Sequence, residues 1–494
     1  MALPKDIEKI KKQATVFVIF GATGDLSRKK LFPALFTLFQ SGLLPEKLKI
    51  IAASRTKHST SQFQNSIKES VNPQDSKKWQ DFAKKIEFIA SDVAENKNLE
   101  NIAHRLSEIE KETKSCIKAI IYLAVAPTIY EDAFENIGKN KLNFGCLVHK
   151  NKSRVVIEKP FGYDFASAQR LNALITRFFE KEQIFRIDHF LGKETVQNIL
   201  AFRFGNEIFE PLLNSQYVDN IQITFTEYGG IGKRGPFYDN TGALRDVVQN
   251  HLFQLLAIAT MEEPQSFGHE DFRKSRLEII GSIKKIEKED VEKYTVRGQY
   301  EGYRNEEKVD PKSQTETYAL VKFFLENKRW QNVPIYIRTG KKMAGDVASI
   351  IYSFKERKHN VFENFWQNPM PNHITIQIKP AEGIGIRLVA KKPGMTTQLE
   401  PVDMEFCYKR SFDTPQPEAY ERLLMDVILG DQTLFIGEVG ASWKVIDPIR
   451  EAWDAGKPPL AFYKPGSWGP QEADQFMMRE GHVWLAPYLT ICKI

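Results

Sequence analysis

The sequence has few cysteines and no long apolar run, and each scarcity excludes a class of protein. Its 494 residues include four cysteines, far apart in the chain: Cys116, Cys146, Cys407 and Cys492. Their spacing does not fit a zinc site, so we expect no metal centre, and three of them lie in apolar or aromatic surroundings typical of inert, buried thiols. That pattern suits a reducing cytoplasm. No apolar run could span a bilayer, and the charged start of the chain lacks the apolar centre of an export signal.

The sequence also lacks a strong charge of either sign. The formal net charge of +6 is mild for this length, and no Lys/Arg-rich block stands out. We therefore predict no nucleic-acid partner, whereas anionic small molecules suit a mild positive excess. Hydrophobic residues make up 42% and charged residues 27%, as in ordinary globular proteins. The length allows two or three domains, and we find no internal repeat or low-complexity linker.

A strand, a glycine turn and a helix open the chain. Residues 15–20 form a continuous apolar, β-branched run that predicts a strand buried on both faces. Gly21-Ala-Thr-Gly-Asp-Leu26 follows at once, and residues 27–39 then carry apolar side chains at helical spacing. This context favours a dinucleotide whose pyrophosphate lies at the helix N-terminus. The glycine spacing differs from GxGxxG, and the alternative is a plain β–α turn.

The second strand indicates which dinucleotide. Residues 48–53 form another apolar run, after which NAD-binding folds place an acid that holds the ribose. Here Arg55 and Lys57 follow instead, and an arginine favours the 2′-phosphate of NADP. For Lys57 we expect a solvated loop cation. A third strand, 86–89, runs into Ser91-Asp92-Val93, a position that often lies near the adenine.

The pattern of predicted strands and helices changes after residue 193. Strands at 117–126 and 154–158 continue the alternation with helical segments that predicts a parallel sheet. Beyond residue 193 few helices separate the strand-like pieces, which are 218–227, 277–280, 294–300, 317–324, 334–338, 350–354, 374–378, 385–390 and 404–408. We predict an α/β Rossmann-like doubly wound coenzyme domain, residues 1–188, and an α+β domain with a large, mostly antiparallel sheet, residues 189–494.

The stretch Phe185-Arg-Ile-Asp-His-Phe-Leu-Gly-Lys-Glu194 places an acid, a histidine and a lysine within six positions. If the chain turns helical at His189, Lys193 lies one turn on and on the same face. The glycine between them would let a ligand approach closely, which suits a doubly charged phosphate. Asp188 is then free to serve another residue. The alternative is a solvated turn of mixed charge.

Residues 241–254 predict a helix whose apolar stripe includes His251. The histidine is therefore buried or lines a cleft, and the alternative to a catalytic role is a satisfied core residue. Asp246 precedes it by five residues, about 140° around an ideal α-helix. A carboxylate that orients His251 should then come from another segment, and Asp188 is the candidate.

Together these motifs resemble the glucose-6-phosphate dehydrogenase family in order and spacing. The resemblance runs from about residue 15 to near the C-terminus, and the RIDHFLGKE element at 186–194 is its most specific part. The other matching motifs are Gly21-Ala-Thr-Gly-Asp-Leu26, Glu158-Lys-Pro-Phe-Gly162, Gly242-Ala-Leu-Arg-Asp-Val-Val-Gln-Asn-His251, Tyr336-Ile-Arg-Thr-Gly-Lys341, Lys391-Lys-Pro-Gly-Met395 and Glu418-Ala-Tyr-Glu-Arg422.

The resemblance implies oxidation of glucose 6-phosphate to 6-phosphoglucono-δ-lactone with NADP, the first step of the oxidative pentose phosphate pathway. It implies a cytoplasmic homo-oligomer, dimer or tetramer, without a metal. His251 would be the general base and Asp188 its carboxylate partner. Substrate-binding roles fall on His189, Lys193, Glu227, Asp246, Lys341 and Lys159. Coenzyme-binding roles fall on Gly21, Thr23, Gly24, Asp25, Leu26, Arg55, Asp92, Val93 and Lys159.

Two positions depart from the family pattern. Asp346 stands where a Lys or Arg usually follows five positions after Lys341, so we expect weaker binding of the sugar phosphate unless Lys342 compensates or the loop is displaced. Phe190 replaces a common tyrosine and loses one hydroxyl. Asp346 keeps two alternatives open, a related dehydrogenase with a shifted, unphosphorylated substrate and a non-catalytic sugar-phosphate or NADP sensor. The phosphate-binding pair at 189 and 193 argues against the first, and the acid–histidine pair argues against the second.

Overall fold

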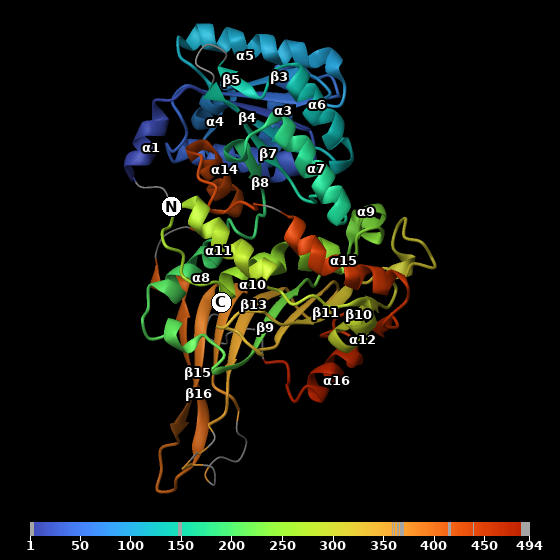
Figure 1. The fold of residues 1–494 in the computed structure, drawn as a ribbon. Helices are drawn as coiled ribbons and strands as arrows, with labels where there is room; N and C mark the ends of the chain where they lie inside the picture. The colour runs from blue at the N-terminus through green and yellow to red at the C-terminus, as the bar shows by residue number, and fades with distance from the viewer. Residues whose placement is uncertain are drawn as a thin grey trace. The chain divides into compact units, whose positions relative to one another are not determined.

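Two groups of segments make up the chain in the computed structural model, which describes residues 4–146, 151–357, 359, 361–362, 365, 370–412, 416–437 and 439–485 (Figure 1). The first unit comprises Met1–Lys193, Pro264–Arg273 and Pro417–Val439, and the second comprises Glu194–Glu263, Lys274–Gln416 and Gly440–Ile494. The division into domains after residue 188 stays a prediction. Among the described residues, no helix has both the length and the apolar character needed to cross a membrane.

A parallel sheet forms the first unit because its strands are apolar on both faces. β1 (Thr15–Phe20) is buried at every position, as predicted for a strand covered on both sides. The described residues form six strands in the order β3-β2-β1-β4-β7-β8, with every neighbouring pair parallel. The other strands are β2 (Leu48–Ser54), β3 (Ile86–Ala90), β4 (Lys118–Leu123), β7 (Arg154–Ile157) and β8 (Ile184–Arg186). The order confirms the predicted doubly wound fold, which binds ligands where the strand order reverses, here beside β1.

The helices of the first unit are amphipathic. α5 (Leu99–Thr113) buries Leu99, Ile102 and Leu106 at helical spacing. The other helices are α1 (Pro4–Lys11), η1 (Ser27–Leu31), α2 (Phe32–Gln40), α3 (Thr60–Val71), α4 (Ser76–Ala83), α6 (Tyr130–Lys139), α7 (Phe165–Phe178) and α14 (Ala419–Leu429). β5 (Phe144–Cys146) and β6 (Asn151–Lys152) form a separate antiparallel pair.

A large, mostly antiparallel sheet forms the second unit, as predicted (Figure 1). The described residues give nine strands in the order β16-β15-β14-β13-β9-β12-β11-β10-β17, and only β9–β12 and β10–β17 pair in parallel. The strands are β9 (Val218–Thr226), β10 (Thr295–Tyr300), β11 (Tyr318–Phe323), β12 (Ile335–Gly340), β13 (Val347–Phe354), β14 (His373–Lys379), β15 (Gly383–Lys391), β16 (Leu399–Cys407) and β17 (Ala461–Tyr463). Its helices include α8 (Glu194–Phe204), α9 (Gly235–Asp239), η7 (Leu244–Leu252), α10 (Phe253–Thr260), α12 (Val291–Tyr294), α13 (Tyr408–Ser411), α15 (Gly440–Asp454) and α16 (Gln471–Arg479).

One predicted strand is wrong. Residues 277–280 lie in helix α11 (His269–Gly281). The short apolar run there fits either structure by itself. The buried side chains of Phe272, Arg276 and Ile280 recur every four residues, so the run continues one face of a helix that begins in a charged segment.

The predicted helix that carries His251 is a π-helix over most of its length. η7 (Leu244–Leu252) has the i→i+5 repeat and continues directly into α10. Residues five apart in such a helix lie on nearly the same side, so the predicted angle of about 140° between Asp246 and His251 is wrong. A second π-helix, η1, follows the first glycine turn. π-helical turns occur often at functional sites, and both of these lie beside predicted site residues.

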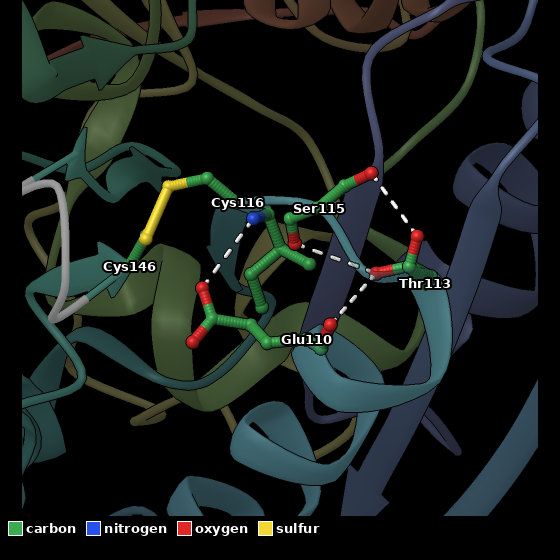
Figure 2. Close-up of a disulfide and its surroundings, with 6 residues drawn as sticks. Glu110, Thr113, Ser115, Cys116 and Cys146 are labelled. Atoms are coloured by element: carbon green, nitrogen blue, oxygen red, sulfur yellow. Dashed lines mark hydrogen bonds between the residues drawn. A yellow bond between two sulfur atoms is a disulfide. The ribbon is translucent and has the colours of Figure 1, made fainter.

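A disulfide between Cys116 and Cys146 corrects the prediction of inert thiols (Figure 2). The two cysteines are 30 residues apart in sequence, and their Cα atoms are 5.5 Å apart, within the range that a disulfide needs. The fold brings together the segment before β4 and the end of β5, which the sequence spacing does not reveal. Figure 2 also shows Glu110, whose carboxylate accepts the main-chain N–H of Ile117 at 3.4 Å.

Candidate active site

A pocket of about 450 Å³ lies at the carboxyl ends of the first unit's strands. It brings together six of the predicted coenzyme-binding residues, which are Gly21, Thr23, Gly24, Arg55, Asp92 and Val93. Asp25 and Leu26 are the two residues before η1 instead, and the Asp25 carboxylate is 3.1 Å from Lys29 Nζ. The position of the pocket is the one at which doubly wound folds bind dinucleotides.

The glycine turn beside this pocket needs a residue without a side chain. Gly21 has a φ of +77°, and a Cβ there would lie 2.1 Å from the carbonyl oxygen of Ala124. The Gly21 carbonyl accepts the N–H of Gly24 at 2.9 Å and the hydroxyl of Ser27 at 3.0 Å. The turn is therefore tight and fixed, as a backbone that approaches a pyrophosphate closely requires.

The polar groups of the pocket suit a phosphorylated nucleotide. The Arg55 side chain is 84% exposed, and its Nε is 3.9 Å from Asp92 Oδ2, so the guanidinium can meet a phosphate with little loss of its own hydration. Ser91 is buried, and within the described part of the chain its hydroxyl has no hydrogen-bond partner. Buried polar groups normally have partners, so this hydroxyl fits a ligand in the pocket. The residues present therefore fit NADP.

Sequence reasoning missed part of this pocket. Ser91 belongs to the segment expected near the adenine, and the unpredicted lining residues are Phe20, Ser54, Thr56, Ala124, Val125, Ala126, Thr128 and Ile129. Most of them follow the ends of β2 and β4. Because parallel strands end at one edge of the sheet, the residues just after each predicted strand were the available signal.

The stretch from Asp188 to Lys193 forms turns, and α8 begins only at residue 194. Asp188 is buried, and its Oδ1 accepts the main-chain N–H of Phe190 at 2.9 Å. The Lys193 ammonium lies 4.4 Å from the centre of the Phe190 ring. A Cβ on Gly192 would lie 2.7 Å from the carbonyl oxygen of Ala419, so this glycine admits helix α14 and not a ligand, contrary to our prediction.

A partly buried glutamate, Glu158, lies next to Lys159. Hydroxyls of Tyr122 and Tyr420 both donate to Glu158 Oε1, and the Tyr130 hydroxyl donates to its main-chain carbonyl at 2.9 Å. Burial raises the pKa of the Glu158 carboxyl to about 7, although both tyrosine hydrogen bonds and the charge of Lys159 lower it. The Tyr420 ring also stacks on His189, with ring centres 6.5 Å apart. One tyrosine thus joins the predicted phosphate ligand to the glutamate that precedes Lys159.

The second unit gathers three of the predicted sugar-binding residues. β9 and β12 run in parallel with Thr226 opposite Gly340, so the next residues, Glu227 and Lys341, emerge side by side. The Lys341 ammonium forms an ion pair with Glu227 and lies 4.0 Å from Asp246 Oδ2. In such a cluster the ammonium can donate hydrogen bonds to sugar hydroxyls, and the two carboxylates can accept hydrogen bonds from them.

His251 is buried on η7, as predicted, and is 3% exposed. It belongs to the second unit, whereas Asp188, His189, Lys193 and Lys159 belong to the first. The assignment of Asp188 as the partner of His251 stays a prediction.

The departure at Asp346 has a local partner. Asp346 Oδ1 is 3.4 Å from the ammonium of Lys379 and accepts the N–H of Tyr228 at 3.3 Å. Lys342, which we considered as a compensating cation, pairs with Glu306 at 3.1 Å. The cation beside Asp346 is therefore Lys379, which β14 supplies.

Comparison with known proteins agrees with this geometry. Residues 18–198 match the model of the glucose-6-phosphate dehydrogenase NAD binding domain, and residues 200–485 match that of its C-terminal domain. The chain is 38% identical over 491 residues to glucose-6-phosphate 1-dehydrogenase of Chlamydia muridarum, covering 95% of this chain and 96% of that protein. It is 38% identical over 481 residues to the Bacillus subtilis enzyme, covering 95% and 98%.

Solved structures agree as well. A glucose-6-phosphate dehydrogenase in complex with its substrate glucose-6-phosphate superposes with a TM-score of 0.88 at 31% identity, covering 96% of this chain and 99% of that chain. The Mycobacterium avium glucose-6-phosphate 1-dehydrogenase superposes with a TM-score of 0.81 at 31% identity, covering 97% and 100%. The chain belongs to the glucose-6-phosphate dehydrogenase family.

Proposed function

We propose that this chain oxidises glucose 6-phosphate to 6-phosphoglucono-δ-lactone with NADP as the hydride acceptor, the first step of the oxidative pentose phosphate pathway. The observation that carries the proposal is the buried cluster of Lys341, Glu227 and Asp246, which is built to hold a polyol. The pocket beside Gly21 and the exposed Arg55 support a coenzyme with a 2′-phosphate.

The protein's groups would hold the sugar and move one proton. Lys341 would donate to sugar oxygens while Glu227 and Asp246 accept sugar hydroxyls, which fixes the ring before reaction. His251 would take the proton of the C1 hydroxyl, a task for which an imidazole is suited near neutral pH. Asp188 would orient and stabilise the imidazolium, as a carboxylate does in other acid–histidine pairs. NADP, when bound, supplies the acceptor for the hydride that leaves C1.

The phosphate and the coenzyme ring need further ligands. His189 and Lys193 would bind the substrate phosphate, and Lys159 would lie between sugar and nicotinamide. The short segment from 188 to 193 carries both phosphate-binding groups, which supports a phosphorylated substrate over a free sugar.

The test is the initial rate of NADPH formation with glucose 6-phosphate and, separately, with glucose, each with NADP and with NAD. We expect saturating turnover with the phosphorylated sugar and NADP. Comparable turnover with free glucose would favour a shifted substrate. A folded protein that binds NADP but turns over neither sugar would favour a sensor.

We further propose that the chain forms a homo-oligomer, dimer or tetramer. Apolar side chains stand exposed on β15 and β16, the two strands at one edge of the large sheet, namely Leu388, Val402, Met404 and Phe406. Such clusters mark protein interfaces, and this sheet is where the family resemblance implies dimerisation. Light scattering of the purified protein tests this, and Met404→Glu should shift the mass to the monomer.

A further inference from the structure

The helix that carries Asp246 and His251 has no side-chain cap of its own. The residue before η7 is Ala243, and an alanine cannot accept the free N–H groups at a helix start. Glu316 does so from the segment before β11. Its main-chain carbonyl accepts the N–H of Ala243 at 3.1 Å, and its Oε1 accepts the N–H of Leu244 at 2.9 Å. One residue, distant in sequence, thus fixes the start of this helix.

The surroundings of the Glu316 carboxylate are shaped to hold it. Gly242 has a φ of +72°, and a Cβ there would lie 2.3 Å from Glu316 Oε1. Burial raises the pKa of this carboxyl to about 7, whereas the Leu244 N–H and the charges of Arg245 and Arg297 lower it. Both guanidiniums donate to main-chain carbonyls, Arg245 to Thr241 and Arg297 to Pro458, each at 2.7 Å.

The next residue holds the other half of the sugar site. The main-chain carbonyl of Thr317 accepts the N–H of Lys341 at 2.9 Å. The Tyr463 hydroxyl lies 2.9 Å from Thr317 Oγ1 and donates to the Lys341 carbonyl at 2.7 Å. Residues 316 and 317 therefore bind both the start of η7, which carries Asp246, and the main chain of Lys341. Asp246 and Lys341 are held in place by two consecutive residues.

We propose that Glu316 is a positioning residue for the reaction, holding η7 so that Asp246 and His251 keep their places relative to Lys341. The proposal rests on the proposed function, because the positions matter only if these residues act on a sugar. Glu316 itself touches neither substrate nor coenzyme in this account. A displacement of about 1 Å at reacting groups can cost about 10²-fold in rate, so a missing cap can be seen in kinetics.

The test compares Glu316→Ala and Glu316→Gln with wild type. The alanine removes the acceptor, and we expect kcat/KM for glucose 6-phosphate to fall about 10- to 100-fold, with a higher KM for the sugar and an unchanged KM for NADP. Glutamine keeps an oxygen that accepts the Leu244 N–H, so kcat/KM of Glu316→Gln should stay within about fivefold of wild type. The remaining loss is expected because a neutral oxygen is a weaker acceptor than a carboxylate. Asp426→Asn is the matched control, because burial also raises the pKa of that carboxyl to about 7, and it belongs to the first unit. It should leave the sugar KM unchanged.

A second variant approaches the same contact from the other side. Gly242→Ala should displace the carboxylate, and it also strains the backbone because this residue has a φ of +72°. The part of its effect that arises from the carboxylate should disappear in the Glu316→Ala background, since both changes break one contact. A folded Glu316→Ala protein with wild-type kcat and KM would overturn the proposal. If wild type shows no turnover, the proposed function fails, and calorimetry decides this inference: weaker glucose 6-phosphate binding by Glu316→Ala supports it, and equal binding overturns it.

Discussion

The two units hold their functional charges in opposite ways. In the first, Arg55 is 84% exposed and lies 3.9 Å from Asp92. In the second, Lys341 is 4% exposed and lies between two carboxylates. An exposed cation stays hydrated until it meets a ligand, whereas a buried cluster is desolvated and ordered before the ligand arrives. The exposed arginine can set the preference between NADP and NAD. The buried cluster can hold the sugar, but any change that disrupts it also lowers the stability of the fold.

The largest expected effect lies in the second unit. His251→Ala should lower kcat about 10²–10⁴-fold, the usual contribution of a general base, while NADP still binds as in wild type. Steady-state rates and coenzyme titration measure the two quantities. Full turnover by the folded variant would remove His251 from the mechanism.

The buried cluster should also carry stability. Lys341→Ala leaves Glu227 and Asp246 without their cation, so we expect the free energy of unfolding to fall by about 3–5 kcal/mol. Denaturant titration measures this. Lys342→Ala is the control, since Lys342 is 36% exposed whereas Lys341 is 4% exposed, and ion pairs with an exposed partner contribute about 1 kcal/mol or less. Equal losses in the two variants would contradict a special role for the buried pair.

Each unit also holds one partly buried glutamate whose pKa is raised to about 7, Glu158 among tyrosine hydroxyls and Glu316 against main-chain N–H groups. The folded state holds these protons more tightly than the unfolded chain, so their contribution to stability is full below pH about 4.5 and is lost as the pH rises through about 7. For each carboxyl, the free energy of unfolding should fall by roughly 3 kcal/mol over this pH range. Glu158→Gln and Glu316→Gln should each flatten the pH dependence of unfolding over this range. An unchanged pH dependence in either variant would mean that its carboxyl is ionised throughout.

The exposed cation should affect one coenzyme only. Arg55→Ala should weaken NADP binding about 10- to 100-fold, the value of hydrogen bonds to a charged group, and leave NAD within about twofold. Lys57→Ala, which changes the neighbouring loop cation, should shift neither. Fluorescence titration with both coenzymes measures this, and equal loss for NADP and NAD would show that Arg55 does not contact the 2′-phosphate.

The smallest effect concerns Asp346. Because this acid and Lys379 are partly exposed, Asp346→Ala should lower the KM for glucose 6-phosphate by about fivefold at most. Lys379→Ala should raise it by a similar factor. If both variants keep the wild-type KM, the pair lies too far from the phosphate to matter.

The sequence predicted those elements whose structure is determined by residues close together in the chain. The run at 15–20 gave β1 with its observed bounds, since a continuous apolar segment before a glycine turn has few other structures. The π-helix was not predictable, because over nine residues the period of an apolar stripe hardly separates i→i+4 from i→i+5 hydrogen bonding. Gly192 was misread since the helix that fills its open side begins at Ala419, more than two hundred residues later.

The first unit includes residues 417–439, which are synthesised long after the rest of that unit. Arg154 in β7 donates to the carbonyl of Ile428 at 2.8 Å, and Phe185 packs edge-on against Phe435 with ring centres 4.8 Å apart. A nascent chain that has emerged only as far as residue 193 lacks these partners. The first unit therefore completes its packing only after residues 417–439 have been made, and until then part of its apolar surface stays uncovered.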